Sequence, residues 1–169
     1  MDKTKHNIIV AVIMSIYKND RLDFVKESVE SILNQTYKHF DLYIIFDGPI
    51  QEEVNIYLKN IDDNRINIIE RKDNRGLAYS LNELLKIVLV KNYLFIARMD
   101  ADDISKNDRF EKQLAFLNKH LETDCVGSWA VEISEDGSEY FKKKMPLTHE
   151  ACLDMFKKTR LHDSSNSYV

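Results

Sequence analysis

Three aspartates follow a short apolar segment in the middle of the chain. The segment "YLFIARM" covers residues 93–99, and Asp100, Asp102 and Asp103 come directly after it. At neutral pH these carboxylates repel one another unless a cation lies between them. Oxygen ligands without histidine or cysteine favour hard cations such as Mg²⁺ or Mn²⁺. Because Mg²⁺ usually shares its protein carboxylates with substrate phosphates, Asp100 and Asp102 predict a site for a metal and a diphosphate.

The same acids also have a purely structural explanation. They could cap a helix that starts near Ser105, or they could form ion pairs with Arg98 and Arg109. Asp103 suits such a structural role best. A D-x-D pair alone is a weak signal, whereas D-x-D-D after a buried strand of an α/β chain is moderately specific.

The elements that must position these acids alternate along the chain. Strands are expected at 7–17, 40–47, 65–70 and 93–99, and amphipathic helices follow them at 23–35, about 51–60, 76–90 and about 106–120. This alternation predicts an α/β fold with a mostly parallel sheet, right-handed crossovers and helices on both faces. The β-branched run at 7–17 is typical of a strand buried on both sides.

The last third of the chain has a different pattern. Segments 125–133 and 138–144 flank the turn "SEDG" and predict a hairpin, and Thr148 can cap a last helix that reaches about Lys158. We expect a single domain over residues 1–169, with its core at 7–150 and a polar tail at 159–169.

In a parallel sheet, ligands bind outside the carboxyl ends of the strands. The residues expected there are Ser15, Tyr17, Asp47, Asn74, Gly76, Asp100 and Asp102. Tyr17 could stack on a base, and Asp47 could accept a hydrogen bond from a ring N–H such as that of uracil. Their structural alternatives are a core tyrosine and a turn-forming aspartate.

The segment "RKDNRG" at 71–76 enters the third helix. Asn74 and Gly76 are expected to shape this entry, where helix N–H groups and Arg71, Lys72 or Arg75 could meet anionic oxygens. For each of the three basic residues the alternative is a solvated surface position.

Composition limits the class of protein. The chain has 169 residues, 44% of them hydrophobic and 31% charged, a net charge of −4 and a pI of about 5.7. These values fit one globular domain and give no electrostatic case for binding nucleic acid. Lysine and arginine are plentiful enough for a local basic patch at a membrane surface. Cys125 and Cys152 show no metal-site spacing and are expected to be buried free thiols.

The chain has no apolar run near the roughly 20 residues that span a bilayer. Its polar start, "MDKTKHN", does not have the pattern of a signal peptide. A cytoplasmic location is expected, with the inner face of the membrane as the variant that a basic patch would favour.

Four motifs together resemble a known family. "IVAVIMSIYKND", "FDLYIIFDGP", "DNRGLAYSLNELL" and "ARMDADDISKNDRFEKQLAFL" resemble, in order and spacing, the N-terminal half of family 2 glycosyltransferases of the GT-A fold. The similarity covers roughly residues 7–150. It is strongest to bacterial enzymes that build capsular, exopolysaccharide or lipopolysaccharide chains.

The resemblance implies an inverting, metal-dependent transfer of a sugar from a nucleotide diphosphate, often UDP, to a glycan or lipid-linked acceptor. It places Tyr17 against the base, Asp47 on the uracil ring, and Asn74 and Gly76 in the nucleotide-side loop. Asp100 would approach the ribose or the metal. Asp102 would bind Mn²⁺ or Mg²⁺ that bridges the diphosphate and acts as a Lewis acid.

The chain departs from the family pattern in several places. Ser15 and Asn107 stand where the family usually has prolines, and the chain ends some sixty-odd residues after Asp102. The expected fold is therefore truncated on the acceptor side, and the general base is unknown, with Asp163 as a weak candidate. The apolar surface that such a truncation exposes favours a homo-oligomer.

Two other functions compete with transfer. The chain could be a non-catalytic nucleotide-sugar binder or an assembly module. "DADDI" could also be the nucleophile motif of a haloacid-dehalogenase-like phosphatase. However, that motif normally closes the first strand of its domain, and Ile104 stands where it has a hydroxyl residue or valine.

Overall fold

The computed structural model describes residues 10–134 and 137–163. In the last helix it describes the side chains of 149–155 and 157 only. The chain divides into two compact units, Met1–Phe116 and Leu117–Val169, and each is described by itself. The expectation that all 169 residues form a single domain stays a prediction.

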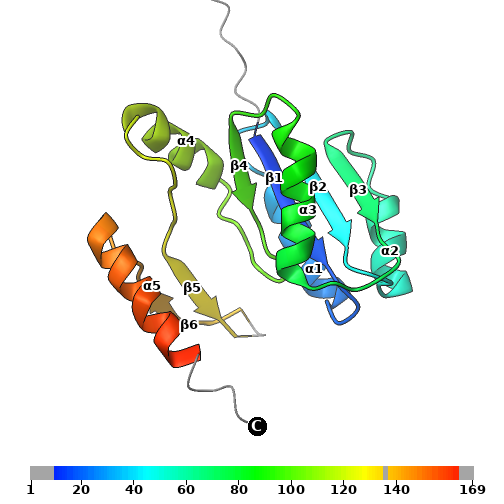
Figure 1. Ribbon diagram of the computed structural model, residues 1–169. Helices are drawn as coiled ribbons and strands as arrows, with labels where there is room; N and C mark the ends of the chain where they lie inside the picture. The colour runs from blue at the N-terminus through cyan, green and yellow to red at the C-terminus, as the bar shows by residue number, and fades with distance from the viewer. Residues whose placement is uncertain (1–9, 135–136, 164–169) are drawn as a thin grey trace, which may run out of the picture. The chain divides into compact units, whose positions relative to one another are not determined.

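The first unit is built on a parallel sheet of four strands (Figure 1). The strands are β1 (Val10–Ile16), β2 (Phe40–Phe46), β3 (Ile66–Glu70) and β4 (Phe95–Arg98), in the spatial order β3-β2-β1-β4. The connecting helices are α1 (Leu22–Leu33), α2 (Glu52–Lys59) and α3 (Leu77–Leu89), and α4 (Arg109–Lys119) follows β4. All three strand pairs are parallel, which confirms the predicted α/β fold.

Helices cover both faces of this sheet, as the sequence predicts. On one face, alternate residues of β1 such as Val12 and Met14 pack with apolar residues of α1, α2 and α4. On the other face, Ala11 and Ile13 pack with Leu84 and other residues of α3. Figure 1 shows α3 in front of the sheet and α1 and α2 behind it. Every residue of β1 except the half-buried Ser15 is buried, so this strand is covered on both sides.

The helix after β4 starts later than expected. It begins at Arg109, whereas the apolar spacing predicted a start near 106. Residues 99–108 form turns and irregular backbone, because hydrogen bonds to Ser31 of α1 and to Gln35 just after it occupy their polar groups. Asp103 lies six positions before the helix and does not cap it, so that structural explanation for Asp103 was wrong.

The second unit contains the predicted hairpin and the last helix. β5 (Ala130–Ile133) and β6 (Glu139–Lys143) pair antiparallel. α5 (His149–Asp163) begins where expected, and the backbone N–H of Ala151 donates to Oγ1 of Thr148 at 3.3 Å. The helix continues through Asp163, beyond its predicted end near Lys158, so residues 159–163 of the predicted polar tail are helical. The rest of that tail, 164–169, lies outside the described residues.

The structure also corrects the prediction for the two cysteines. Cys125 and Cys152 are free thiols, as predicted, but both are exposed rather than buried. Both belong to the second unit, where no described side chain from Leu117 onward is buried. Apolar neighbours in the sequence therefore do not indicate burial here. No helix in the described part of the chain is long and apolar enough to cross a membrane.

Candidate functional site

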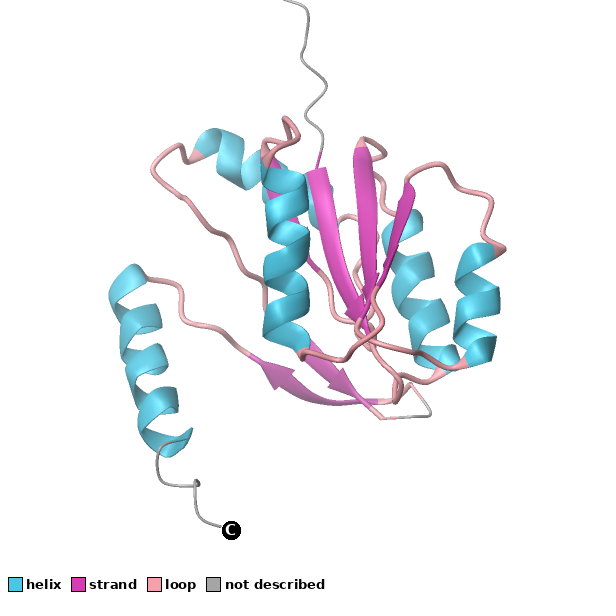
Figure 2. Cartoon of the chain, turned by 45° about the vertical axis from the view of Figure 1, so that its right-hand side comes forward, coloured by secondary structure: helices cyan, strands magenta, loops and turns pink. Residues whose placement is uncertain are grey.

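The loops after β1, β2 and β4 meet at one edge of the sheet. The N–H of Asp47, just after β2, donates to the carbonyl of Ile16 at the end of β1 at 2.7 Å. The hydroxyl of Ser28, in the middle of α1, donates to the carbonyl of Asp100 at 2.8 Å, and the charge of Asp102 acts on Asp20 in the turn after β1. Figure 2 shows the arrowheads of the sheet pointing to this common end. The strands thus bring together the loops that carry the predicted site residues.

Asp47 is the centre of the β2 side of this edge. Its side chain is 3% exposed. Its Oδ1 accepts hydrogen bonds from the guanidinium of Arg71 and from the N–H of Arg75 at 2.8 Å, and its Oδ2 accepts from the N–H of Gly76 at 2.9 Å. Burial on its own would raise the pKa of the Asp47 carboxyl. These hydrogen bonds and the charge of Arg71 outweigh it and hold the pKa below its ordinary value.

Arg71 is a buried partner of Asp47, so the alternative of a solvated surface residue was wrong for it. Its side chain is 12% exposed. The guanidinium also donates to Glu83 and to the hydroxyl of Ser80, both at 2.8 Å, and to the carbonyl of Asp73 at 2.9 Å. Arg71 therefore fixes the segment 71–76 against β2 and the start of α3.

The glycines allow this close packing. Gly48 has φ +83°, and a Cβ at this position would lie 2.8 Å from the backbone nitrogen of Asn74. The side-chain amide of Asn74 donates to the carbonyl of Asp47 at 3.0 Å. Gly76 has φ 86° and ψ 161° at the N-cap of α3, a conformation that only glycine adopts without strain. Asn74 and Gly76 thus shape the helix entry, as the sequence predicted.

Tyr17 lies on the β1 side of the edge. It is 41% exposed, so the alternative of a core tyrosine was wrong. Its N–H donates to Oδ2 of Asp20 at 2.9 Å, and the N–H of Asp20 donates back to the carbonyl of Tyr17 at 3.1 Å. This tight turn holds the ring of Tyr17 in solvent next to the strand end. Ser15 lies in β1 opposite Ile45 and is half buried.

The acids after β4 have different surroundings. Both carboxylate oxygens of Asp100 accept from Arg98, at 2.9 and 3.0 Å, so the ion-pair explanation is confirmed for Asp100. Asp103 has a raised pKa, first because it is partly buried and then because Asp100 and Asp102 lie nearby. Asp102 itself is exposed.

Asp20 brings a further carboxylate toward this acidic group. Its pKa is raised, mainly by burial and to a smaller extent by the charge of Asp102, while the hydrogen bond from Tyr17 opposes the rise. The turn after β1 and the turn after β4 are therefore electrostatic neighbours. Negative charge accumulates at this edge, and Asp102 and Asp103 are its exposed members.

These residues fit a divalent cation that is shared with a ligand. Among the described residues, no group of three or more His, Cys, Asp or Glu side chains is placed to hold a metal ion alone. Mg²⁺ binding through one or two carboxylates plus substrate phosphates does not need such a group. Asp102 would be the first ligand, and Asp100, whose two oxygens each accept one hydrogen bond from Arg98, could join through its remaining acceptor positions.

Sequence reasoning missed three polar residues, two in α1 and one just after it, that hold the segment following β4. Ser28, Ser31 and Gln35 bond to backbone or side-chain groups of residues 100–110. Ser28 was placed only on the apolar stripe of the helix. The available signal was the position of these polar residues, at 28, 31 and 35, among residues that face the core.

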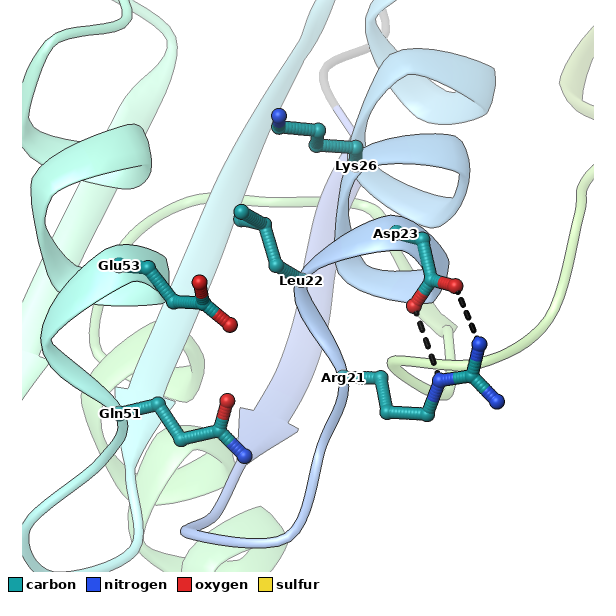
Figure 3. A pocket seen from close by; sticks show the side chains of 6 residues that line it. All are labelled: Arg21, Leu22, Asp23, Lys26, Gln51 and Glu53. Atoms are coloured by element: carbon teal, nitrogen blue, oxygen red, sulfur yellow. Dashed lines mark hydrogen bonds and ion pairs between the residues drawn. The ribbon is translucent and has the colours of Figure 1, made fainter.

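A hollow on the first unit lies apart from the predicted residues. It is lined by the first residues of α1 and by residues at the start of α2: Arg21, Leu22, Asp23, Lys26, Gln51 and Glu53 (Figure 3). Arg21 and Asp23 form an ion pair at its rim. None of the predicted site residues lines it. The catalytic candidate Asp163 is the last residue of α5, and its side chain lies outside the described residues.

Comparison with known proteins gives relatives in polysaccharide biosynthesis. The Bacillus subtilis protein EpsE, named as a glycosyltransferase, is 40% identical over 131 residues, which cover 76% of this chain and 45% of that protein. The O-antigen biosynthesis glycosyltransferase WbnJ of Escherichia coli is 35% identical over 140 residues, 82% of this chain and 52% of WbnJ. This chain therefore spans about half the length of the curated relatives it matches.

Solved structures confirm the fold. The S. aureus protein TarS in complex with UDP-GlcNAc superposes with a TM-score of 0.57 at 20% identity, over 66% of this chain and 32% of that one. At this identity the likeness concerns the fold alone. The model of the family described as "Glycosyl transferase family 2" matches residues 11–167. Since this match covers most of the sequence, the chain belongs to glycosyl transferase family 2.

Proposed function

We propose that this chain binds a nucleotide-diphosphate sugar, with UDP-sugar favoured, for a metal-dependent inverting transfer to a glycan or lipid-linked acceptor in surface polysaccharide synthesis. The observation that carries the proposal is the meeting of three loops at the carboxyl edge of the sheet, in a chain of this family. EpsE and WbnJ match it at sequence identities of 40% and 35%, and the name of WbnJ links it to O-antigen synthesis.

The base would lie between the turn after β1 and the end of β2. The exposed ring of Tyr17 is available for stacking. Asp47 already receives three hydrogen bonds, and a carboxylate offers about four acceptor positions. One ring N–H of uracil could therefore use the remaining position on Oδ2, while Ser15, Asn74 and Gly76 line the same side.

The diphosphate would lie at the acidic edge. A cation on Asp102 would neutralise the leaving phosphate, which is the Lewis-acid chemistry that Mn²⁺ or Mg²⁺ supplies. Asp100, held by Arg98, would face the ribose or the same cation. The guanidinium of Arg71 already forms ion pairs with Asp47 and Glu83. Arg75 and Lys72 are therefore the basic residues of this loop that could bind anionic oxygens of the donor.

Inverting transfer needs a general base for the acceptor. The acceptor hydroxyl attacks the anomeric carbon from the side opposite the diphosphate, the base takes the hydroxyl proton, and the bond from the sugar to the nucleoside diphosphate breaks. The base is unassigned in the described residues, and Asp163 stays the sequence candidate. The loops described here contribute binding and orientation of the donor.

Calorimetric titration tests the donor site. We expect UDP and UDP-GlcNAc to bind in the presence of Mn²⁺ and at least about tenfold more weakly without it, a difference of roughly 1.4 kcal/mol. Asp102→Asn should remove the metal dependence. Asp62→Asn, an exposed aspartate in the turn before β3, is the matched control and should bind like the wild type. Equal affinity with and without Mn²⁺ contradicts the metal role.

Turnover separates the enzyme from the alternative binder. Release of UDP from UDP-sugars is measured with Mn²⁺ and a mixed pool of glycan and lipid-linked acceptors. Acceptor-dependent release supports transfer by this chain. Tight donor binding without any release favours the non-catalytic nucleotide-sugar module.

A further inference from the structure

We infer that Ser28 and Ser31 of α1 and Gln35 just after the helix, together called the polar stripe, are positioning residues that hold the metal-binding loop in place. The loop comprises residues 100–106, between β4 and the turn before α4. The inference rests on the proposed function, because it assigns the stripe a role in presenting Asp102 to a cation. None of the three side chains is proposed to touch the ligand itself.

Each side chain of the stripe forms a hydrogen bond with a different residue of the loop. The hydroxyl of Ser28 donates to the carbonyl of Asp100 at 2.8 Å, and the hydroxyl of Ser31 accepts from the N–H of Ser105 at 2.9 Å. The amide nitrogen of Gln35 donates to the carbonyl of Lys106 at 2.7 Å.

Gln35 also fixes the point where the loop ends. Its amide nitrogen lies 3.2 Å from the hydroxyl of Ser105, and its amide oxygen accepts from the N–H of Phe110 at 3.1 Å. The next residue of the chain, Thr36, donates its N–H to the carbonyl of Asn107 at 2.7 Å. α1 and the residues just after it thus follow the loop from its first residue to the start of α4.

Burying these polar side chains costs free energy unless they form hydrogen bonds. Ser28 and Gln35 are fully buried, Ser28 among the buried residues Val25, Val29 and Ile32 of α1 and Gln35 just after the helix. A buried polar side chain without a hydrogen bond destabilises the fold. Here the partners are mostly backbone groups of a segment without regular secondary structure, so the stripe satisfies that segment's polar groups as well as its own.

The consequence for Asp102 follows from the spacing. Asp102 lies between two anchored residues, because the carbonyl of Asp100 is held by Ser28 and the N–H of Ser105 is held by Ser31. The carboxylate of Asp100 is fixed as well, by Arg98. A short segment anchored at both ends has few conformations to lose when a cation binds. The exposed carboxylate is therefore presented to the ligand in advance.

The test uses conservative variants of the stripe. Ser28→Ala and Ser31→Ala each remove one hydrogen bond to the loop, and Ser31→Thr keeps the hydroxyl at this half-buried position. Val29→Ala is the matched control, since it opens a cavity on the same helix without touching the loop's polar groups. If the two serines only stabilised the fold, Val29→Ala would disturb the loop as much as the serine variants do.

Two readouts are measured on the full chain. The first is hydrogen–deuterium exchange of residues 100–106 without any ligand. The second is the affinity for UDP in the presence of Mn²⁺. We expect each alanine variant of the serines to speed exchange of the loop and to weaken Mn²⁺-dependent binding by about tenfold, which corresponds to roughly 1.4 kcal/mol. Ser31→Thr should restore both. Val29→Ala should lower the melting temperature and leave both readouts unchanged.

Three results would overturn the inference. They are unchanged exchange in both serine variants, faster exchange with unchanged affinity, and equal effects from Val29→Ala. If the wild-type chain binds neither Mn²⁺ nor UDP, the proposed function fails. The exchange data then still decide whether the stripe anchors the loop.

Discussion

The substitution Asp47→Asn probes the group that holds the segment 71–76. It keeps the shape of the side chain and removes the charge that the guanidinium of Arg71 and two backbone N–H groups share. Removing one partner of a buried ion pair costs about 3–5 kcal/mol. Arg71 keeps its bond to Glu83, which lowers the cost. We therefore expect a loss of about 3 kcal/mol in the free energy of unfolding.

The loss should depend on pH. The folded pKa of Asp47 lies below its ordinary value of 3.8, so its stabilising effect is complete above that value. The effect disappears as the pH falls through the folded pKa, because the carboxylate then becomes protonated in the folded state too. The stability difference between the wild type and Asp47→Asn should accordingly shrink as the pH drops below about 4.

Urea unfolding followed by far-UV circular dichroism measures both effects. Tryptophan fluorescence is unsuitable, because the single tryptophan, Trp129, lies in the second unit. Asp62→Asn is again the matched control and should change stability by less than about 0.5 kcal/mol. A loss below about 1 kcal/mol at pH 7 would refute the central role of Asp47. A difference that persists unchanged at pH 3 would refute the charge as its cause.

Three further substitutions are tested by thermal unfolding. Gly76→Ala should cost about 1–3 kcal/mol from its backbone conformation alone, since a Cβ there meets nothing within 4 Å. Gly48→Ala should cost more, because the new Cβ would also collide with the backbone of Asn74; equal melting temperatures for the two variants would contradict the collision. Tyr93→Phe removes the phenol that donates to Asp41 at 2.5 Å and lies 2.8 Å from the hydroxyl of Tyr43. A loss of about 1–2 kcal/mol is expected, and a wild-type melting temperature would show that these bonds contribute nothing net.

The sheet and its helices could be predicted because burial leaves a periodic signal. The uninterrupted apolar run of β1 and the 3.6-residue spacing of α3 reflect which side chains face the core. The edge where ligands bind follows from the parallel topology, so Tyr17 and Asp47 could be named before their neighbours were known. These inferences need no knowledge of individual contacts.

The contacts within the site could not be predicted, because they join residues far apart in the chain. Arg71 was expected either to meet anionic oxygens or to be a solvated surface residue, since nothing near it in sequence shows that it pairs with Asp47, 24 positions earlier. The start of α4 was placed near 106 on spacing alone, whereas hydrogen bonds from Gln35 hold that segment outside the helix. The prediction that both cysteines are buried was wrong for a related reason. Apolar neighbours in sequence do not form a core without packing partners.

Paramagnetic broadening by Mn²⁺ tests the location of the site most directly. In the presence of UDP, added Mn²⁺ should broaden the backbone amide resonances of residues 17–20 and 100–103. It should spare residues 62–65 and 91–93, which lie in turns that precede strands. Asp102→Asn should abolish the effect. Broadening that centres elsewhere, or that persists unchanged in Asp102→Asn, would contradict a cation site at the carboxyl edge of the sheet.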